Sequence, residues 1–182
     1  IDINFPCIEI KNRYSSSYQA SPLLLAIKRE NIEIIKLLLE NDKIDVNARN
    51  GKNGNTALCS AIEIGNNQII QLLLSHKNID INLPSKDKRY NIYNRRFHLE
   101  LEEKTPLYIA IEKDNDIIAE LLLSNENINV NHPNSTGIVT PLYAAIDKGN
   151  IKIIKLLLSN KNIDVNLPNK FYEQSRMYYD MH

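Results

Sequence analysis

Several features that the sequence lacks limit the kind of protein it can be. The chain has 182 residues but only two cysteines, Cys7 and Cys59, which is too few for a disulfide framework. Its 22 basic and 22 acidic residues cancel, so net charge gives no reason to expect nucleic acid or an anionic membrane as a partner. No apolar run approaches the ~18 residues that span a bilayer, and residues 1–4 are not a signal peptide. We therefore expect an intracellular, cytoplasmic protein, with a nuclear location left open.

Patterns typical of catalysis and metal binding are scarce as well. The four histidines fall in unrelated turns or loops, never at metal-ligand spacing with Cys or a carboxylate. Gly51-Lys52 lacks the preceding glycine spacing and the following Ser or Thr of a phosphate-binding loop. Cys59 lies in a predicted helix, where we expect a small core residue rather than a nucleophile. We therefore expect no enzyme activity, no metal or other cofactor, and no small-molecule substrate.

What the sequence does contain is one phrase repeated at a fixed stride. A Ser or Thr opens each copy, a Leu-Leu-Leu triplet follows, and an Ile-Asp/Asn-Val/Ile-Asn segment closes it. The opening residue and the closing Asn are always 26 positions apart. Such strict self-similarity is typical of a solenoid, in which each unit stacks on its neighbours. The copies span residues 21–47, 56–82, 105–131 and 140–166.

Each copy predicts two short helices. The opening hydroxyl residue is a preferred N-cap, and three of the four copies continue with Pro, which suits the first helical position. A small Ala in the first helix allows a second helix, which contains the leucine triplet, to approach closely. Gly65 and Gly149 predict left-handed helix ends, whereas Glu30 and Asp114 replace glycine in the other copies. We expect strain at those two corners.

These units resemble the ankyrin repeat, whose pattern is Thr-Pro-Leu-His, an Ala, a central Gly, a leucine-rich second helix and a terminal Val-Asn. The family's His is replaced by Leu24, Cys59, Tyr108 and Tyr143, so we expect its hydrogen bonding to be absent or altered. The resemblance implies a mainly α solenoid of stacked helix-turn-helix units with β-hairpin fingers. We expect residues 1–182 to form a single ankyrin-repeat domain, cut from a longer array.

The segments between units, which form the fingers in similar proteins, alternate in length. The spacing from a closing Asn to the next opening residue is 17, 9, 23 and 9 positions in turn. Opening residues two units apart are always 84 positions apart, which indicates that the true period is a pair of units. The long fingers are predicted at residues 5–20, 83–104 and 167–182.

The long fingers are unusual in composition, because they hold seven of the nine tyrosines and all three phenylalanines. Aromatic residues and Arg are enriched at the centres of protein interfaces. Apolar and polar residues alternate in the middle finger, which predicts paired strands at about 88–93 and 96–101. Packing of the aromatic rings against each other and the helices is the competing interpretation. The predicted contact residues are Tyr90, Tyr93, Arg95 and Arg96.

The same finger carries a basic cluster with interleaved tyrosines over residues 86–96, a combination that suits phosphates and stacked bases. Three glutamates follow within residues 100–103 and would lie on the opposing strand. We therefore favour internal charge pairing over nucleic-acid binding.

The ends of the first helices form a second candidate surface. In ankyrin-like arrays these positions line the concave face beside the fingers, and an ordinary solvated face is the alternative interpretation. Ile64 departs from that alternative because it is apolar where its equivalents are charged. The candidate residues are Lys28, Arg29, Glu63, Ile64, Glu112, Lys113, Asp147 and Lys148.

Together these patterns predict a non-catalytic protein–protein interaction module, a scaffold or adaptor. An unidentified protein partner would bind the concave face and the long fingers, with no membrane involved. The alternative is a regulatory or spacing segment of a larger enzyme or channel. A third possibility is homotypic assembly through apolar stacking faces at the ends of the array.

Overall fold

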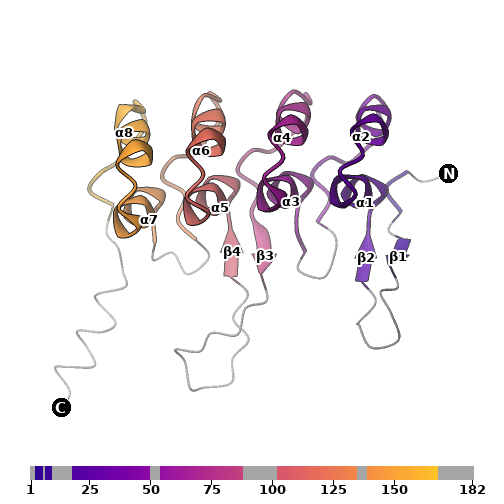
Figure 1. Ribbon diagram of the computed structural model, residues 1–182, viewed down its shortest axis with the longest axis horizontal. Helices are drawn as coiled ribbons and strands as arrows, with labels where there is room; N and C mark the ends of the chain where they lie inside the picture. The colour runs from indigo at the N-terminus through magenta and orange to yellow at the C-terminus, as the bar shows by residue number, and fades with distance from the viewer. Residues whose placement is uncertain are drawn as a thin grey trace, which may run out of the picture.

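In the part of the chain that the structure describes, eight short helices stand as four pairs in a row (Figure 1). The computed structural model describes residues 3–5, 7–9, 18–49, 54–87, 102–134 and 139–167. Within these ranges, no helix is both long and apolar enough to cross a membrane. The four pairs are α1 (Pro22–Lys28) with α2 (Ile32–Leu39), α3 (Ala57–Ile64) with α4 (Asn67–Leu74), α5 (Pro106–Glu112) with α6 (Asp116–Leu123), and α7 (Pro141–Lys148) with α8 (Ile151–Ser159).

Every helix begins at a side chain that caps its first turn. The Thr56 hydroxyl accepts a 3.1 Å hydrogen bond from the Cys59 backbone amide, and the other three predicted hydroxyl caps do the same for α1, α5 and α7. Asparagine side chains cap the second helices, as at Asn66, whose Oδ1 accepts from the Ile69 amide at 3.2 Å. Such caps typically stabilise a helix by about 1 kcal/mol each. The predicted caps of the first helices are therefore confirmed.

The corners between paired helices are left-handed, as predicted. Gly65 and Gly149 have φ angles of 84° and 69°. Glu30 and Asp114 occupy the same position with φ angles of 52° and 56°. A residue with a Cβ atom costs roughly 1–2 kcal/mol in this conformation, so the predicted strain at these two corners is confirmed.

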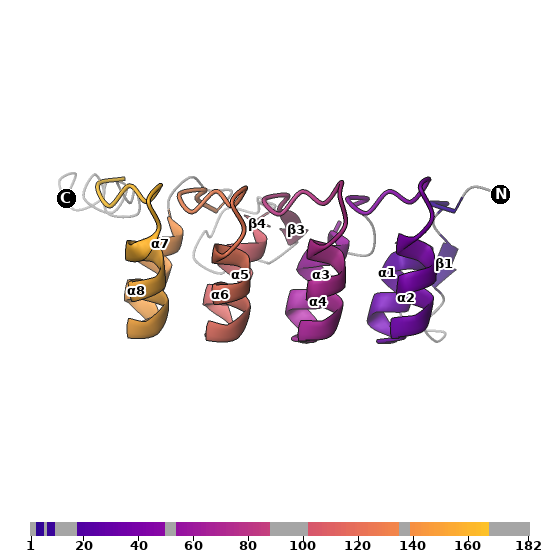
Figure 2. The same ribbon diagram turned by 90° about the horizontal axis from the view of Figure 1, so that it is seen from above.

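The hydrophobic core runs continuously through the row. First helices pack on first helices from α1 to α7, while α2 packs on α4 and α6 packs on α8 (Figure 2). The alanine of the repeated phrase is fully buried at Ala61, Ala110 and Ala145, which lets the helices come close together. Burial of each large aliphatic side chain contributes about 1.5–3 kcal/mol, so stacking supplies most of the stability of helices this short.

The closing asparagines join each unit to the next. The Asn82 Nδ2 donates to the carbonyl of Asn127 at 2.8 Å, and its Oδ1 accepts from the Asn129 amide at 2.7 Å. Asn4, Asn47 and Asn131 make the same two bonds to the units that follow them. This asparagine ladder explains why the repeated phrase ends in Asn.

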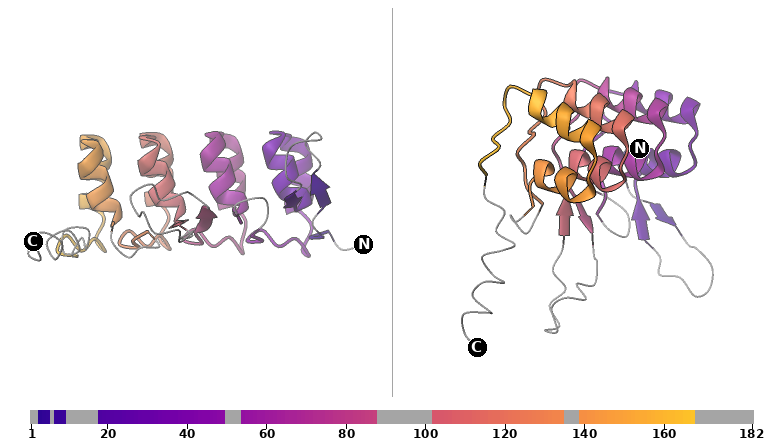
Figure 3. Two further views of the ribbon diagram at one scale, coloured as in Figure 1. Left: turned by 90° about the horizontal axis from the view of Figure 1, so that it is seen from below. Right: turned by 60° about the vertical axis from the view of Figure 1, so that its left-hand side comes forward.

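Among the described residues, two antiparallel strand pairs project from the same side of the row, next to the first helices (Figures 1 and 3). Strand β1 (Cys7–Glu9) pairs with β2 (Tyr18–Ala20) in the first long finger. Strand β3 (Ser85–Asp87) pairs with β4 (Glu102–Lys104) in the second, with Ser85 opposite Lys104. The strands predicted at 88–93 and 96–101, and residues 168–182 of the third predicted finger, lie outside the described residues.

Candidate functional site

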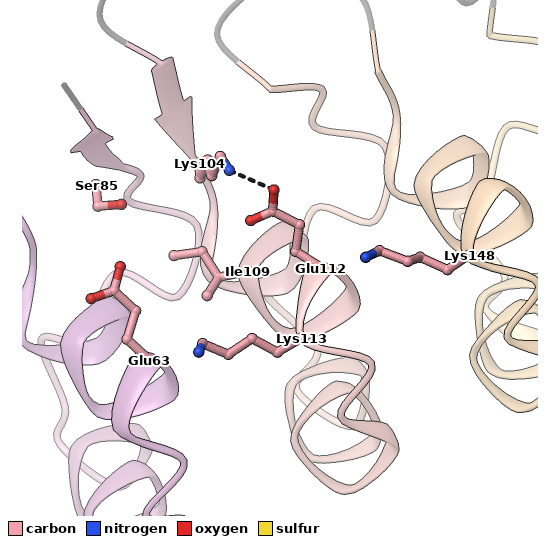
Figure 4. Close-up of a pocket in the computed structure, with 7 residues that line it drawn as sticks. All are labelled: Glu63, Ser85, Lys104, Ile109, Glu112, Lys113 and Lys148. Atoms are coloured by element: carbon pink, nitrogen blue, oxygen red, sulfur yellow. Dashed lines mark hydrogen bonds and ion pairs between the residues drawn. The ribbon is translucent and has the colours of Figure 1, made fainter. Parts of the chain in front are cut away.

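An open groove lies where the base of the β3–β4 finger meets the ends of three first helices (Figure 4). Its volume is about 490 Å³. Strands β3 and β4 border one side, and α3, α5 and α7 contribute charged side chains from three successive helix pairs. The lining residues are Glu63, Ser85, Lys104, Ile109, Glu112, Lys113 and Lys148.

The most enclosed charge in the groove belongs to Lys104, at the end of β4. Its side chain is only 5% exposed, and its Nζ lies 2.6 Å from Glu112 Oε1 at the end of α5. The same Nζ lies 5.8 Å from the centre of the Tyr108 ring, within the range of a cation–π contact. A lysine is rarely buried this deeply unless it is paired. The pair therefore fastens the finger to the helix and holds the Glu112 carboxylate in place.

A second polar contact of the same kind lies one helix pair earlier. The Asn55 Nδ2 donates to Glu63 Oε2 at 3.0 Å, again joining the residue before a helix cap to the end of that helix. In both cases the two residues are eight positions apart in the chain. Two neighbouring carboxylates of the groove are thus oriented before any partner arrives.

Lys113 and Lys148 add positive charge to the groove. Lys113 is exposed at the cap after α5, and Lys148 is exposed at the last residue of α7. Figure 4 shows the Lys113 side chain extending toward Glu63 and the Lys148 side chain extending toward Glu112. Among the described residues, neither lysine makes a hydrogen bond or an ion pair. Their ammonium groups are therefore accessible to negative charges on another molecule.

The predicted helix-end residues all lie at the C-terminal ends of the four first helices. Four of the eight, Glu63, Glu112, Lys113 and Lys148, line the groove, and Glu112 is the one that is half-buried. The other four are exposed but do not line it: Lys28, Arg29, Ile64 and Asp147. The predicted finger residues Tyr90, Tyr93, Arg95 and Arg96 lie outside the described residues.

Sequence reasoning missed three lining residues, Ser85, Lys104 and Ile109. A signal for Lys104 was present, because its spacing of eight positions from Glu112 repeats that of Asn55 from Glu63. Ser85 carried no such signal, since it belongs to strand β3 and reaches the groove only when the finger lies against the stack. Ile109 lies on α5, one turn before the predicted residue Lys113.

Charge pairing within the finger is present at its base. Lys86 Nζ lies 3.7 Å from Glu103 Oε1 on the opposite strand, and Arg49 Nη1 lies 3.4 Å from the same oxygen. For these strands the predicted internal pairing is confirmed. The side chains involved are about one third or more exposed, so each pair contributes at most about 1 kcal/mol.

Cys59 lies in the core of α3, next to the base of the finger. Its side chain has no exposed surface, and its Sγ lies 3.7 Å from the Leu83 carbonyl oxygen. Burial raises the pKa of the Cys59 thiol to about 11. The prediction that Cys59 is a core residue is confirmed. Within the described part of the chain, no three His, Cys, Asp or Glu side chains gather as a metal ion would require.

Comparison with known families gives a direct match. The family model for ankyrin repeats, which describes three copies, matches residues 7–85 and 88–169. No curated protein matches the chain. Ankyrin repeats are generally protein–protein interaction modules and typically lack catalytic activity. The helix pairs, the left-handed corners, the hairpin fingers and this match over most of the sequence together show that the chain belongs to the ankyrin-repeat family.

Proposed function

We propose that this chain is a non-catalytic scaffold or adaptor that holds a protein partner in the groove beside the β3–β4 finger. The observation that carries the proposal is the charged arrangement across three helix pairs, with oriented carboxylates at Glu63 and Glu112 and accessible ammonium groups at Lys113 and Lys148. Side chains that are already held in place lose little freedom on association, which lowers the cost of binding. Because Glu112 already neutralises Lys104, the exposed lysines favour acidic residues on the partner.

The long finger extends this proposed surface. Tyr90, Tyr93, Arg95 and Arg96 follow β3 in the chain and precede β4, and both strands border the groove. A partner seated in the groove would therefore lie within reach of a finger rich in aromatic and Arg side chains. We also propose an intracellular, cytoplasmic location, which the buried free thiol of Cys59 supports because such thiols persist in reducing compartments.

Site-specific cross-linking tests the groove directly. A photo-reactive amino acid replaces Lys113 in the groove or, as the control, Lys152 on the outer helix α8, whose side chain is 54% exposed. After irradiation in native extract, the protein labelled at position 113 should cross-link a discrete partner, and Lys148→Glu in the same chain should weaken that product. Equal cross-linking from positions 113 and 152 would contradict the proposal.

The finger needs its own test. Replacing Tyr93, Arg95 and Arg96 together by alanine should reduce the same cross-link while leaving the thermal midpoint unchanged, which is the result expected of residues that contact the partner and do not pack within the chain. A lower thermal midpoint with an unchanged cross-link would assign these residues to packing instead.

A further inference from the structure

Three side chains at equivalent positions of successive units stand along the groove. Ile64 is the last residue of α3, Lys113 is the cap after α5, and Lys148 is the last residue of α7. They are as far apart in the chain as the opening residues of their units are. We call these three residues the isoleucine–lysine row. Both lysines line the groove, and Ile64 directly follows Glu63, which lines it as well.

All three members of this row are exposed. The Ile64 side chain is 40% exposed, and Lys113 and Lys148 make no hydrogen bond or ion pair among the described residues. In the described parts of the two inner helix pairs, the only other exposed large apolar side chain is Ile117, on the outer helix α6. An apolar side chain of a partner that covered Ile64 would remove both apolar surfaces from water. The row therefore offers one apolar contact followed by two cationic ones.

The packing of the first helices sets the distance between the members of the row. Helix α3 packs on α5, and α5 packs on α7. Axes of packed helices lie about 8–10 Å apart. Figure 4 shows that the Lys113 and Lys148 side chains both lean toward the preceding helix pair, so the lysine ammonium groups follow the same spacing. A partner that contacts the whole row needs side chains on one face at intervals of about 8–10 Å.

This interval distinguishes between the regular conformations of a partner chain. In a β-strand, side chains on one face recur about every 6.7 Å, and the next repeat comes at about 13 Å, so neither fits. In a polyproline II helix every third residue points the same way, after a rise of about 9 Å. An α-helix returns to the same face after seven residues, a rise of about 10.5 Å, so spacing alone permits it too.

The size of the groove excludes the α-helix. The groove volume of about 490 Å³ extends over two helix intervals of about 8–10 Å each, which leaves a mean cross-section of roughly 25–30 Å². An α-helix with its side chains is about 10–12 Å across, which corresponds to a cross-section of roughly 80–110 Å². The groove therefore admits a single extended chain.

We propose that the partner inserts a polyproline II segment into the groove, with acidic side chains three residues apart on Lys113 and Lys148. An apolar side chain, three residues further along on the Lys113 side, covers Ile64. This inference rests on the proposed function, because it specifies which segment the protein partner would supply.

The carboxylates of the groove agree with this order of side chains. Glu63 stands beside Ile64 and would repel an acidic side chain there, so the α3 end favours the apolar one. Glu112 already lies 2.6 Å from the Lys104 ammonium, which compensates its negative charge near the acidic positions. Asp147 precedes Lys148 in the chain but does not line the groove.

The backbone of such a segment also finds a partner in the groove. A polyproline II helix has no internal hydrogen bonds, so its amide groups need acceptors when water is displaced. A carboxylate offers about four acceptor positions. Glu112 can therefore accept a backbone amide of the segment while it keeps its contact with Lys104, which holds the carboxylate in place.

Chemical-shift titration of the full chain with synthetic peptides tests the proposal. The probe is Leu-Pro-Pro-Glu-Pro-Pro-Glu with both ends blocked, together with its reversed sequence, because the spacing is the same in either chain direction. A matched peptide has one further Pro between the two Glu residues, which turns the second acid away from the row. In one direction the probe should bind roughly two- to fivefold more tightly than its matched peptide, the range expected for one exposed ion pair.

Variants of the chain assign each contact. Lys148→Gln should abolish the difference between the probe and its matched peptide. Ile64→Ser should weaken binding of the probe and leave unchanged the binding of a peptide with Ala in place of Leu. Lys155→Gln and Ile117→Ser make the same changes at exposed positions on the outer helices α8 and α6, and should alter neither result.

Two outcomes would overturn the proposal. The first is equal binding of the probe and its matched peptide in both directions, including the case in which neither binds. The second is tighter binding of an α-helical peptide with acidic residues seven positions apart. Either leaves the proposed function standing if the cross-link from position 113 still depends on Lys148. A retained spacing preference with no cross-linked partner would instead contradict the proposed function alone.

Discussion

The side-chain amide of Asn150 donates a 2.6 Å hydrogen bond to Asp114 Oδ1, which belongs to the left-handed corner of the preceding helix pair. Asn66 makes the equivalent bond to Glu30 Oε2 at 2.8 Å. The two acidic residues that replace glycine thus bond to the cap of the following pair. The bonds join the first pair to the second and the third to the fourth. They supply a structural reason for the 84-residue period, because they recur at every second interface.

The Asn150–Asp114 bond predicts that the two simplest replacements of Asp114 will differ. Asp114→Ala keeps the strained left-handed backbone and loses the hydrogen bond, so it should lower the free energy of unfolding by about 1–2 kcal/mol. Asp114→Gly loses the same bond but relieves the strain and should be close to neutral. Urea titration of both variants measures the difference. Equal destabilisation would show that the backbone strain is negligible here.

The Lys104–Glu112 pair predicts strong coupling between its members. Glu112→Ala leaves a buried ammonium without its carboxylate and should cost about 2 kcal/mol, a value reduced from the fully buried case because Glu112 is 32% exposed. Changing Lys104→Met as well removes the buried charge and should restore most of the loss. The free energies of unfolding of the two single variants and the double variant complete this cycle. Additive effects would show that the pair carries no coupling.

The Cys59 thiol predicts a loss of stability in alkaline solution. Its pKa rises from 9.0 to about 11 on folding, so the folded state holds the thiol proton more tightly than the unfolded state does. The contribution is fully present below pH 9 and is lost as the pH rises toward 11. Between these values the unaltered chain should lose up to about 3 kcal/mol more than Cys59→Ala. Parallel curves of unfolding free energy against pH for the two proteins would contradict this.

The asparagine ladder predicts a difference between inner and end positions. Asn82→Ala removes two hydrogen bonds between neighbouring units and should lower the free energy of unfolding by about 2–3 kcal/mol. The matched change Asn166→Ala should stay within about 0.5 kcal/mol in dilute, monomeric protein, because the Asn166 side chain bonds to nothing in the described residues. Thermal and urea unfolding of both variants decides the matter, and similar losses would show that the ladder bonds add little.

Features that depend on a few neighbouring residues were predictable from the sequence. The hydroxyl caps at Ser21, Thr56, Thr105 and Thr140 act on amides three residues away. The corners depend on the backbone preference of one residue, so glycine and its acidic replacements were identified by position alone. The strict recurrence of the repeated phrase then predicted the stack, because successive copies of one helix pair bury their apolar faces by packing side by side.

The groove was predictable only in part. The helix-end positions Glu63, Glu112, Lys113 and Lys148 follow from the period of the repeat and from the family resemblance. The strand residues that complete the groove do not, because their place depends on how the finger leaves the stack. Chain length between units indicates that a finger exists, but it does not indicate which of its side chains face the helices.

By itself, then, the sequence determined the units, their caps and corners, and the order in which they stack, because these depend on local backbone preferences and on a repeated apolar pattern. The tertiary structure alone decided which polar groups meet across units: Asn66 with Glu30, Asn150 with Asp114, and Asn82 with the turn beyond it. Those contacts join residues from different elements, so they exist only once the hydrophobic stacking has set the distance and angle between neighbouring helix pairs.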